Sequence, residues 1–156
     1  MKPFKFPLES LQTLREQKER VAQQRYSRSL EACETAAEQL KTAETELTGG
    51  WEWLQHELGS GAEASKIMGL RGWCLALESK RNERHAALDE VNRAAKTAFN
   101  DLLKATRERK ALDRFYARSR QAHALARQRE EQKQLDELAV QMSGAVGLLQ
   151  PVMNEN

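Results

Sequence analysis

The side chains that could carry out chemistry are scattered along this sequence. His56, His85 and His123 have no carboxylate, cysteine or second histidine at ligand spacing on a shared face. Cys33 and Cys74 also lack metal-ligand spacing, so we expect two reduced thiols in a cytosolic protein. Serine, lysine and glutamate are common, but no glycine-rich phosphate loop occurs. The sequence therefore predicts a protein that is not an enzyme and that holds no metal or other cofactor.

A basic stretch covers residues 93–129, where arginine and lysine outnumber acidic residues. A basic helix can bind phosphates, but here the charges surround the helix and no aromatic platform accompanies them. We therefore favour a solvated face, or docking on an acidic protein surface, over nucleic-acid binding. The formal net charge of +2 is too small to favour a nucleic-acid or membrane partner by itself.

The composition indicates one all-α domain. The 156 residues are 40% hydrophobic and 31% charged but only 6% aromatic, and they are rich in Ala, Leu, Glu, Gln, Lys and Arg, as in long helices and coiled coils. Such a chain is expected to be elongated. No stretch approaches the roughly 18 to 20 apolar residues needed to span a bilayer, and the opening MKPFKFPLESL lacks the apolar region of a secretory signal. We expect no membrane insertion.

Heptad spacing predicts two long helices in an antiparallel coiled-coil hairpin. In the first helix one row is Tyr26, Cys33, Leu40, Leu47 and Leu54, and the second row is predicted four residues later, at Leu30, Ala37, Glu44, Trp51 and Leu58. In the second helix the rows are Leu70, Leu77, Arg84, Val91, Ala98, Ala105 and Leu112, and Cys74, Arg81, Leu88, Ala95, Leu102, Arg109 and Tyr116.

The hairpin is predicted to occupy residues 1–143 as a single domain. Helix 1 covers about 7–58 with Pro7 in its first turn, the turn 59–64, helix 2 about 65–143, and 144–156 form a flexible tail. Gly59 should close the first helix, and Ser60 with Glu63 reads as a capping box. Gly49-Gly50 is the weak point of helix 1, because two glycines cost about 1 kcal/mol each inside a helix.

The second helix is predicted to overhang its partner at the C-terminal end. Residues 119–142 would project by roughly 35 Å at helical rise. This overhang carries an apolar stripe, Leu135, Leu138, Ala139 and Met142, that must lie against the chain or against a partner. Near the turn, the antiparallel pairing of the two helices places Trp51 beside Trp73. The two rings would serve either as a hydrophobic plug that tightens the hairpin or as an aromatic anchor for a partner.

Motifs at both ends of the chain carry a family resemblance. FKFPLESLQTLREQKERVAQ at 4–23 resembles the opening of the FliJ family of flagellar type III export proteins, and EEQKQLDELA at 130–139 resembles their C-terminal signature. AEQLK at 37–41 and GWCLALE at 72–78 extend the resemblance along nearly the whole chain.

The resemblance implies a stalk-like coiled coil that enters the hexameric ring of the export ATPase, contacts the cytoplasmic domain of the membrane-embedded export gate and hands on export chaperones. It implies a cytoplasmic protein peripherally associated with the inner-membrane export apparatus. The implied ring contacts are Gln132, Lys133, Asp136 and Glu137 from the signature, with Leu135 and Leu138 from the stripe. The implied gate contacts are Gln39, Trp73 and Leu77; Trp51 would substitute for a family tyrosine, because Glu46 and Gly50 stand at the nearest tyrosine positions.

Two alternatives remain at this level. One is the equivalent stalk protein of a virulence-type injectisome, which shares the fold but usually lacks the aromatic-Pro-Leu-Glu opening. The other is a coiled-coil scaffold or chaperone unconnected to export.

Overall fold

A computed structural model describes residues 3–147 of the chain. It contains two helices, α1 (Glu9–Gly59) and α2 (Ala64–Gly147). The first helix begins two residues later than predicted, because Pro7 lies outside it and the carbonyl of Leu8 accepts the first helical bond, from the Gln12 amide at 2.9 Å. The second helix continues past Gly144, since one glycine lowers helix stability without ending the helix. Within the predicted tail, residues 148–156 lie outside the described residues.

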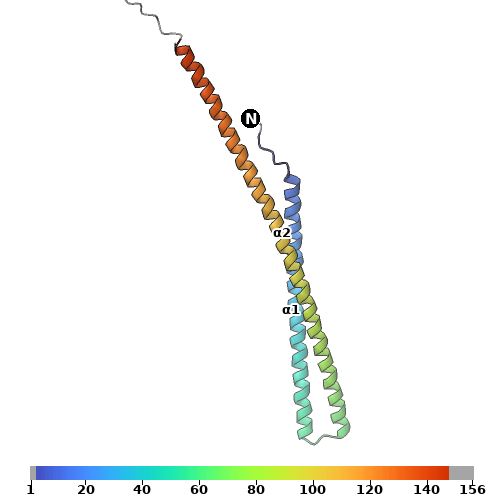
Figure 1. Cartoon of the computed structure of the whole chain (residues 1–156). Helices are drawn as coiled ribbons and strands as arrows, with labels where there is room; N and C mark the ends of the chain where they lie inside the picture. The colour runs from blue at the N-terminus through green and yellow to red at the C-terminus, as the bar shows by residue number, and fades with distance from the viewer. Residues whose placement is uncertain (1–2, 148–156) are drawn as a thin grey trace, which may run out of the picture. The chain divides into compact units, whose positions relative to one another are not determined.

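The two helices pack against each other as an antiparallel hairpin, which confirms the predicted fold class. Their packing falls into two units, one of residues 14–109 and one of residues 1–13 with 110–156. Figure 1 shows α1 and α2 side by side next to the turn, with the chain running toward the turn in α1 and away from it in α2. In the unit of residues 14–109, Tyr26 of α1 faces Phe99 of α2 with ring centroids 5.3 Å apart.

The seam between the helices uses three of the four predicted rows. Both rows of α2 are turned inward except at Arg84, which is exposed, and the row of α1 that contains Tyr26 and Leu54 is buried or half-buried. The second predicted row of α1, from Leu30 to Leu58, is wrong, because all five of its members are exposed. The inward row lies three residues after the first instead of four, and it consists of Ala22, Ser29, Ala36, Ala43, Gly50 and Glu57.

Small side chains in this row allow a close approach of the two backbones. Gly50 is buried, and a Cβ placed on it would lie 3.0 Å from Cδ1 of Leu77 and 3.4 Å from Sγ of Cys74. A Cβ on Gly49 would meet no neighbour within 4 Å. The helix α1 continues through both glycines. The position predicted as a weak point is therefore a place where side chains of α2 pack directly against the backbone of α1.

The turn is closed by Gly61 and not by Gly59, which is still helical. Gly61 has φ of 74°, a left-handed conformation that glycine adopts without steric cost. The amides of Ala62 and Gly61 donate to the carbonyls of Glu57 and Leu58 at 3.2 and 3.5 Å, which is the Schellman arrangement.

The predicted capping box of Ser60 with Glu63 is wrong. The hydroxyl of Ser60 donates backward to the carbonyl of Glu57 at 3.0 Å and so helps to close α1. Glu63 acts through its backbone, because its carbonyl accepts the bond from the Ile67 amide that begins α2. The side chain of Ser60 thus caps the C-terminal end of α1 and does not cap the start of α2.

Charged pairs lie across the helices at the end of the 14–109 unit that is farther from the turn. Arg15 of α1 pairs with Glu108 of α2, and Glu19 accepts hydrogen bonds from Arg109 and from the Thr106 hydroxyl. These cross-helix pairs fix the register where the seam contains few large apolar side chains.

Within the second unit, the described residues 3–13 and 110–147 pack through aromatic rings. The ring centroid of Phe4 lies 5.9 Å from that of Tyr116 and 5.4 Å from that of His123. Phe6 packs edge-on against Tyr116, with 4.9 Å between centroids, and against Phe115. The segment before α1 thereby covers α2 as far as His123. Beyond it, every side chain from Ala124 to Gly144 is exposed.

Candidate functional site

Two groups of exposed apolar side chains are candidates for binding a protein partner. The first, which we call the tryptophan cluster, consists of Trp53 and Trp73 beside the turn, each next in sequence to a buried seam residue, Leu54 or Cys74. The two indole rings meet edge-on at 78°, with centroids 5.8 Å apart. Both tryptophans remain nearly half exposed, so the cluster presents an aromatic surface as well as covering the seam.

The expected partner of Trp73 was Trp51, and the structure pairs it with Trp53 instead. Trp53 and Trp73 each stand one residue before a seam residue, Leu54 and Cys74, so they flank the same side of the hairpin. Trp51 lies about 200° from Trp53 around the helix axis, so it is exposed on a different side of α1. If the second row of α1 is placed three residues after the first, the sequence predicts that Trp53 lies beside Trp73.

The remaining proposed gate residues lie in different environments. Leu77 is buried against Gly50, so its side chain packs in the seam and is not available to a partner directly. Gln39 is exposed, and its side-chain oxygen accepts a hydrogen bond from Nη1 of Arg84 at 2.9 Å. Glu46 pairs with Lys80 across the seam at 2.6 Å. The structure thus brings Trp73 and Leu77 together and leaves Gln39 and Trp51 apart from them.

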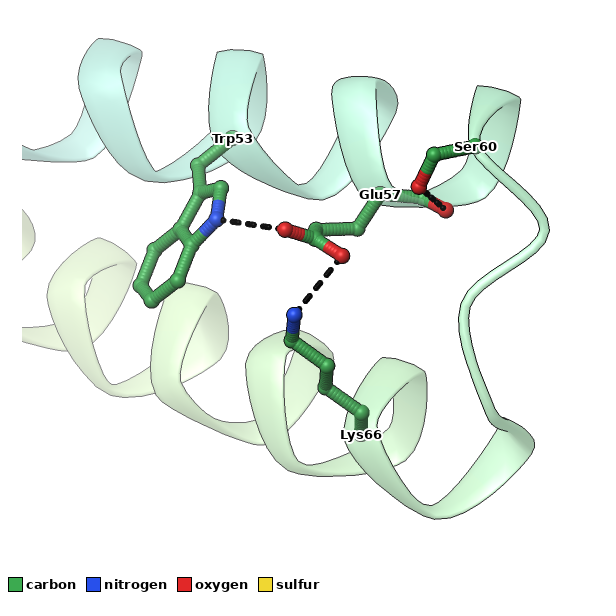
Figure 2. A network of polar contacts seen from close by, with 4 residues as sticks. All are labelled: Trp53, Glu57, Ser60 and Lys66. Carbon is green, nitrogen blue, oxygen red and sulfur yellow. Dashed lines mark hydrogen bonds and ion pairs between the residues drawn. The ribbon is translucent and has the colours of Figure 1, made fainter.

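A polar network anchors the tryptophan cluster to the turn (Figure 2). The indole N–H of Trp53 donates to Oε1 of Glu57 at 3.1 Å, and Nζ of Lys66 donates to Oε2 at 2.8 Å. The hydrogen bond from Lys66 is the main cause that holds the pKa of Glu57 below its ordinary value, and the bond from Trp53 adds to it. Glu57 must therefore stay ionised to join the last turn of α1 to the first turn of α2.

The second candidate surface is the C-terminal stripe, formed by Leu135, Leu138, Ala139 and Met142 on one face of α2. The side chains of Leu135 and Leu138 are 61% and 55% exposed, and Met142 is 69% exposed. Large apolar side chains that share a face and have no cover within the chain mark a surface for association.

The polar residues around the stripe interact only with neighbours one turn away. The amide of Gln132 donates to Oδ1 of Asp136 at 2.9 Å, and Nζ of Lys133 lies 3.9 Å from Oε1 of Glu137. Such pairs four residues apart stabilise a helix by a few tenths of a kcal/mol each. All six residues predicted for ring contact therefore lie on one exposed helical segment.

The histidines are placed away from one another. His123 packs on Phe4, His56 is exposed, and Nδ1 of His85 lies 3.3 Å from Oδ2 of Asp89. This last pair corrects the expectation that no histidine shares a face with a carboxylate. Among residues 3–147, no group of three or more His, Cys, Asp or Glu is placed to hold a metal ion. Cys33 and Cys74 are free thiols.

In the part of the chain that the structure describes, neither α1 nor α2 has a segment long and apolar enough to cross a membrane.

An antiparallel hairpin that leaves apolar side chains exposed beside its turn and near its C-terminal end defines a coiled-coil protein with two candidate binding surfaces. The particular family follows from comparison with known proteins: the family model described as flagellar FliJ protein matches residues 4–146. The chain belongs to the FliJ family, and it is a coiled-coil protein of flagellar type III export. No curated protein and no solved structure gave a significant match.

Proposed function

We propose that this protein is the stalk component of the flagellar type III export ATPase complex. In this proposal the C-terminal stripe binds inside the hexameric ATPase ring, and the tryptophan cluster contacts the cytoplasmic domain of the export gate. The protein would act in the cytoplasm at the inner-membrane export apparatus and would assist the handling of export chaperones. Membership of the FliJ family supports this role.

The exposed stripe is the observation that carries the proposal. Leu135, Leu138 and Met142 share one face of α2, and none of residues 3–144 covers them. The neighbouring carboxylates of Asp136 and Glu137 each have a partner within α2, Gln132 and Lys133, which reduces the cost of bringing a partner against the apolar face. This arrangement suits a helix that enters a protein-lined channel.

Replacing Leu135 and Leu138 by alanine should test the ring contact. If both side chains are buried by the ATPase, the change removes apolar area worth about 1 to 2 kcal/mol for each, which weakens binding by roughly 30-fold to 1000-fold. Alanine is at least as good a helix former as leucine, so the helix itself should persist. Binding is measured by titrating the purified hexamer with labelled stalk protein.

The matched control is Val140→Ala, because Val140 is exposed on the same segment but lies away from the stripe. It should bind the ATPase within a few-fold of the wild type. Equal loss in the control and in the double variant would assign the effect to the segment as a whole. Wild-type binding by the double variant would remove the stripe from the ring contact.

The gate contact requires variants that spare the seam. Leu77 is buried, and its replacement by alanine would cost about 2 to 5 kcal/mol of stability, so it cannot report on binding alone. Trp73→Ala and Trp51→Ala both change exposed side chains, but on different sides of the hairpin. We expect Trp73→Ala to lose gate binding while ATPase binding persists. Retention of gate binding by both variants would contradict the proposed gate surface.

A further inference from the structure

A groove lies along one side of the hairpin in the unit of residues 14–109, away from the tryptophan cluster of the same unit. Its volume is about 700 Å³. Its floor is mainly apolar and is formed by Leu14, Val21 and Ala22 of α1 and by Ala94, Thr97 and Ala98 of α2. Val21 is separated from Trp53 by about 48 Å of helix. Leu14 and Val21 are more than 40% exposed, so the groove opens a substantial apolar area to solvent.

The groove exists because the side chains at this level are too small to close the flank of the seam. The flank of α1 that carries Lys18 and Arg25 continues at seven-residue intervals to Glu46 and Trp53. There the flank is covered by cross-helix pairs, Glu46 with Lys80 and Trp53 with Trp73. At the level of the groove, alanine and threonine on α2 leave the same flank open.

The rim of the groove carries an asymmetric charge. Lys18 and Arg25 stand on the α1 side, seven residues apart, and Asp101 stands on the α2 side. None of these three side chains forms an ion pair with another residue between 3 and 144. By contrast, Arg15 and Arg109 in the same unit are paired across the seam. The rim cations are therefore available to a partner.

We propose that this groove binds an acidic amphipathic helix of another protein. The groove runs along α1 from Leu14 to Arg25, about 16 Å at helical rise, which accommodates three turns of a partner helix. That helix would lay apolar residues at i, i+3, i+4 and i+7 on the floor, the usual mode of helix-in-groove recognition. Two carboxylates seven residues apart would face Lys18 and Arg25. This inference does not depend on the stalk role.

A helix suits the groove better than a small molecule does. The groove is an open channel along the hairpin, and small-molecule sites usually enclose most of the ligand surface. Charge favours an acidic partner because the α1 rim has two cations and the α2 rim a single carboxylate. Electrostatic complementarity of this kind selects the partner and its orientation more than it adds affinity.

The test uses the full-length protein and three synthetic helical peptides, measured by fluorescence anisotropy. The first peptide has a leucine and alanine face flanked by two glutamates seven residues apart. The second has lysine in place of those glutamates, and the third is a scrambled form of the first. We expect saturable binding of the acidic peptide alone. Equal binding of the scrambled or basic peptide, or no binding of the acidic peptide at about 1 mM, would overturn the proposal.

Charge reversal on the rim gives a second test. Lys18→Glu with Arg25→Glu should weaken the acidic peptide by about tenfold or more, given up to about 1 kcal/mol for each exposed pair and added repulsion, and should create binding of the basic peptide. The matched control is Arg28→Glu with Lys41→Glu, two exposed cations of α1 outside the groove. An equal loss in the control would mean that binding reflects net charge and not this groove.

Filling the groove gives a third test that leaves charge unchanged. Ala94→Leu places a larger side chain on the floor, whereas Ala87→Leu does so one heptad earlier on the same flank, outside the groove. Only Ala94→Leu should weaken the peptide, with circular dichroism unchanged in both. Sedimentation velocity completes the test: self-association of the wild type that Ala94→Leu abolishes would identify the occupant as a second copy of the chain and would refute an acidic partner.

Discussion

The close approach of the helices at Gly50 makes a specific prediction for two adjacent glycines of α1. Inside a helix, replacement of glycine by alanine gains about 1 kcal/mol where the new methyl group meets no obstacle. A Cβ on Gly49 has no neighbour within 4 Å. Gly49→Ala should therefore raise the free energy of unfolding by about 1 kcal/mol.

Gly50→Ala should behave differently, although it gains the same helix propensity. Its Cβ would lie 3.0 Å from Cδ1 of Leu77 and 3.3 Å from Cζ3 of Trp73, closer than ordinary van der Waals contact. Overpacking of this kind costs about 1 to 3 kcal/mol. The net effect should run from no change to a loss of about 2 kcal/mol, so the two alanine variants should differ by about 1 to 3 kcal/mol.

Urea unfolding followed by far-ultraviolet circular dichroism measures this difference, provided that the slopes of the transitions agree. Leu77→Ala in the Gly50→Ala background adds a check, because removing the obstructing methyl groups should make the two changes non-additive. If Gly50→Ala stabilises the protein as much as Gly49→Ala, the helices do not meet at Gly50, and the row of small residues does not form the seam.

Three further predictions concern the turn and the thiols. Because the pKa of Glu57 is lowered, the stability that its ionised form adds should be lost as pH falls through that pKa. Lys66→Met should raise the pKa of Glu57 in a carboxyl NMR titration. An unchanged pKa would exclude the contact between Lys66 and Glu57. Gly61→Ala should lower stability by about 1 to 2 kcal/mol in urea unfolding, because φ is 74°. Cys33 should react with a thiol reagent in the folded protein, whereas Cys74, with 0% exposure, should react only after unfolding.

The sequence was sufficient to predict the hairpin and most of its seam. Seven-residue spacing of large apolar residues identified both rows of α2 and the Leu40 and Leu54 row of α1, because those side chains are buried for their hydrophobicity. The exposed Leu135 and Leu138 were also predicted, since helix 1 is too short to cover them. Long elements with strong periodicity are the most predictable part of a fold.

The second row of α1 was not predicted because, in this part of the helix, large apolar side chains are exposed and small side chains are buried. Leu30 and Trp51 look like seam residues by hydropathy, whereas Ala43 and Gly50 are buried because only small side chains fit at a close backbone approach. This error displaced the tryptophan pair. The turn was predicted at the right place but with the wrong closing glycine: the stretch Gly59-Ser60-Gly61 offers two glycines, and hydrogen bonding to preceding carbonyls selects the second.

The exposed C-terminal part of α2 has a consequence for the thermodynamics of binding. From Leu135 to Gly144 the helix is held by its own backbone and by pairs such as Lys133 with Glu137, so its amide hydrogens should exchange faster than those of the packed segment that precedes it. A partner that captures this segment must also restrict its conformational entropy, and that cost lowers the affinity. Gly144→Ala, which touches no neighbour, would then tighten binding by pre-organising the helix, without adding a contact.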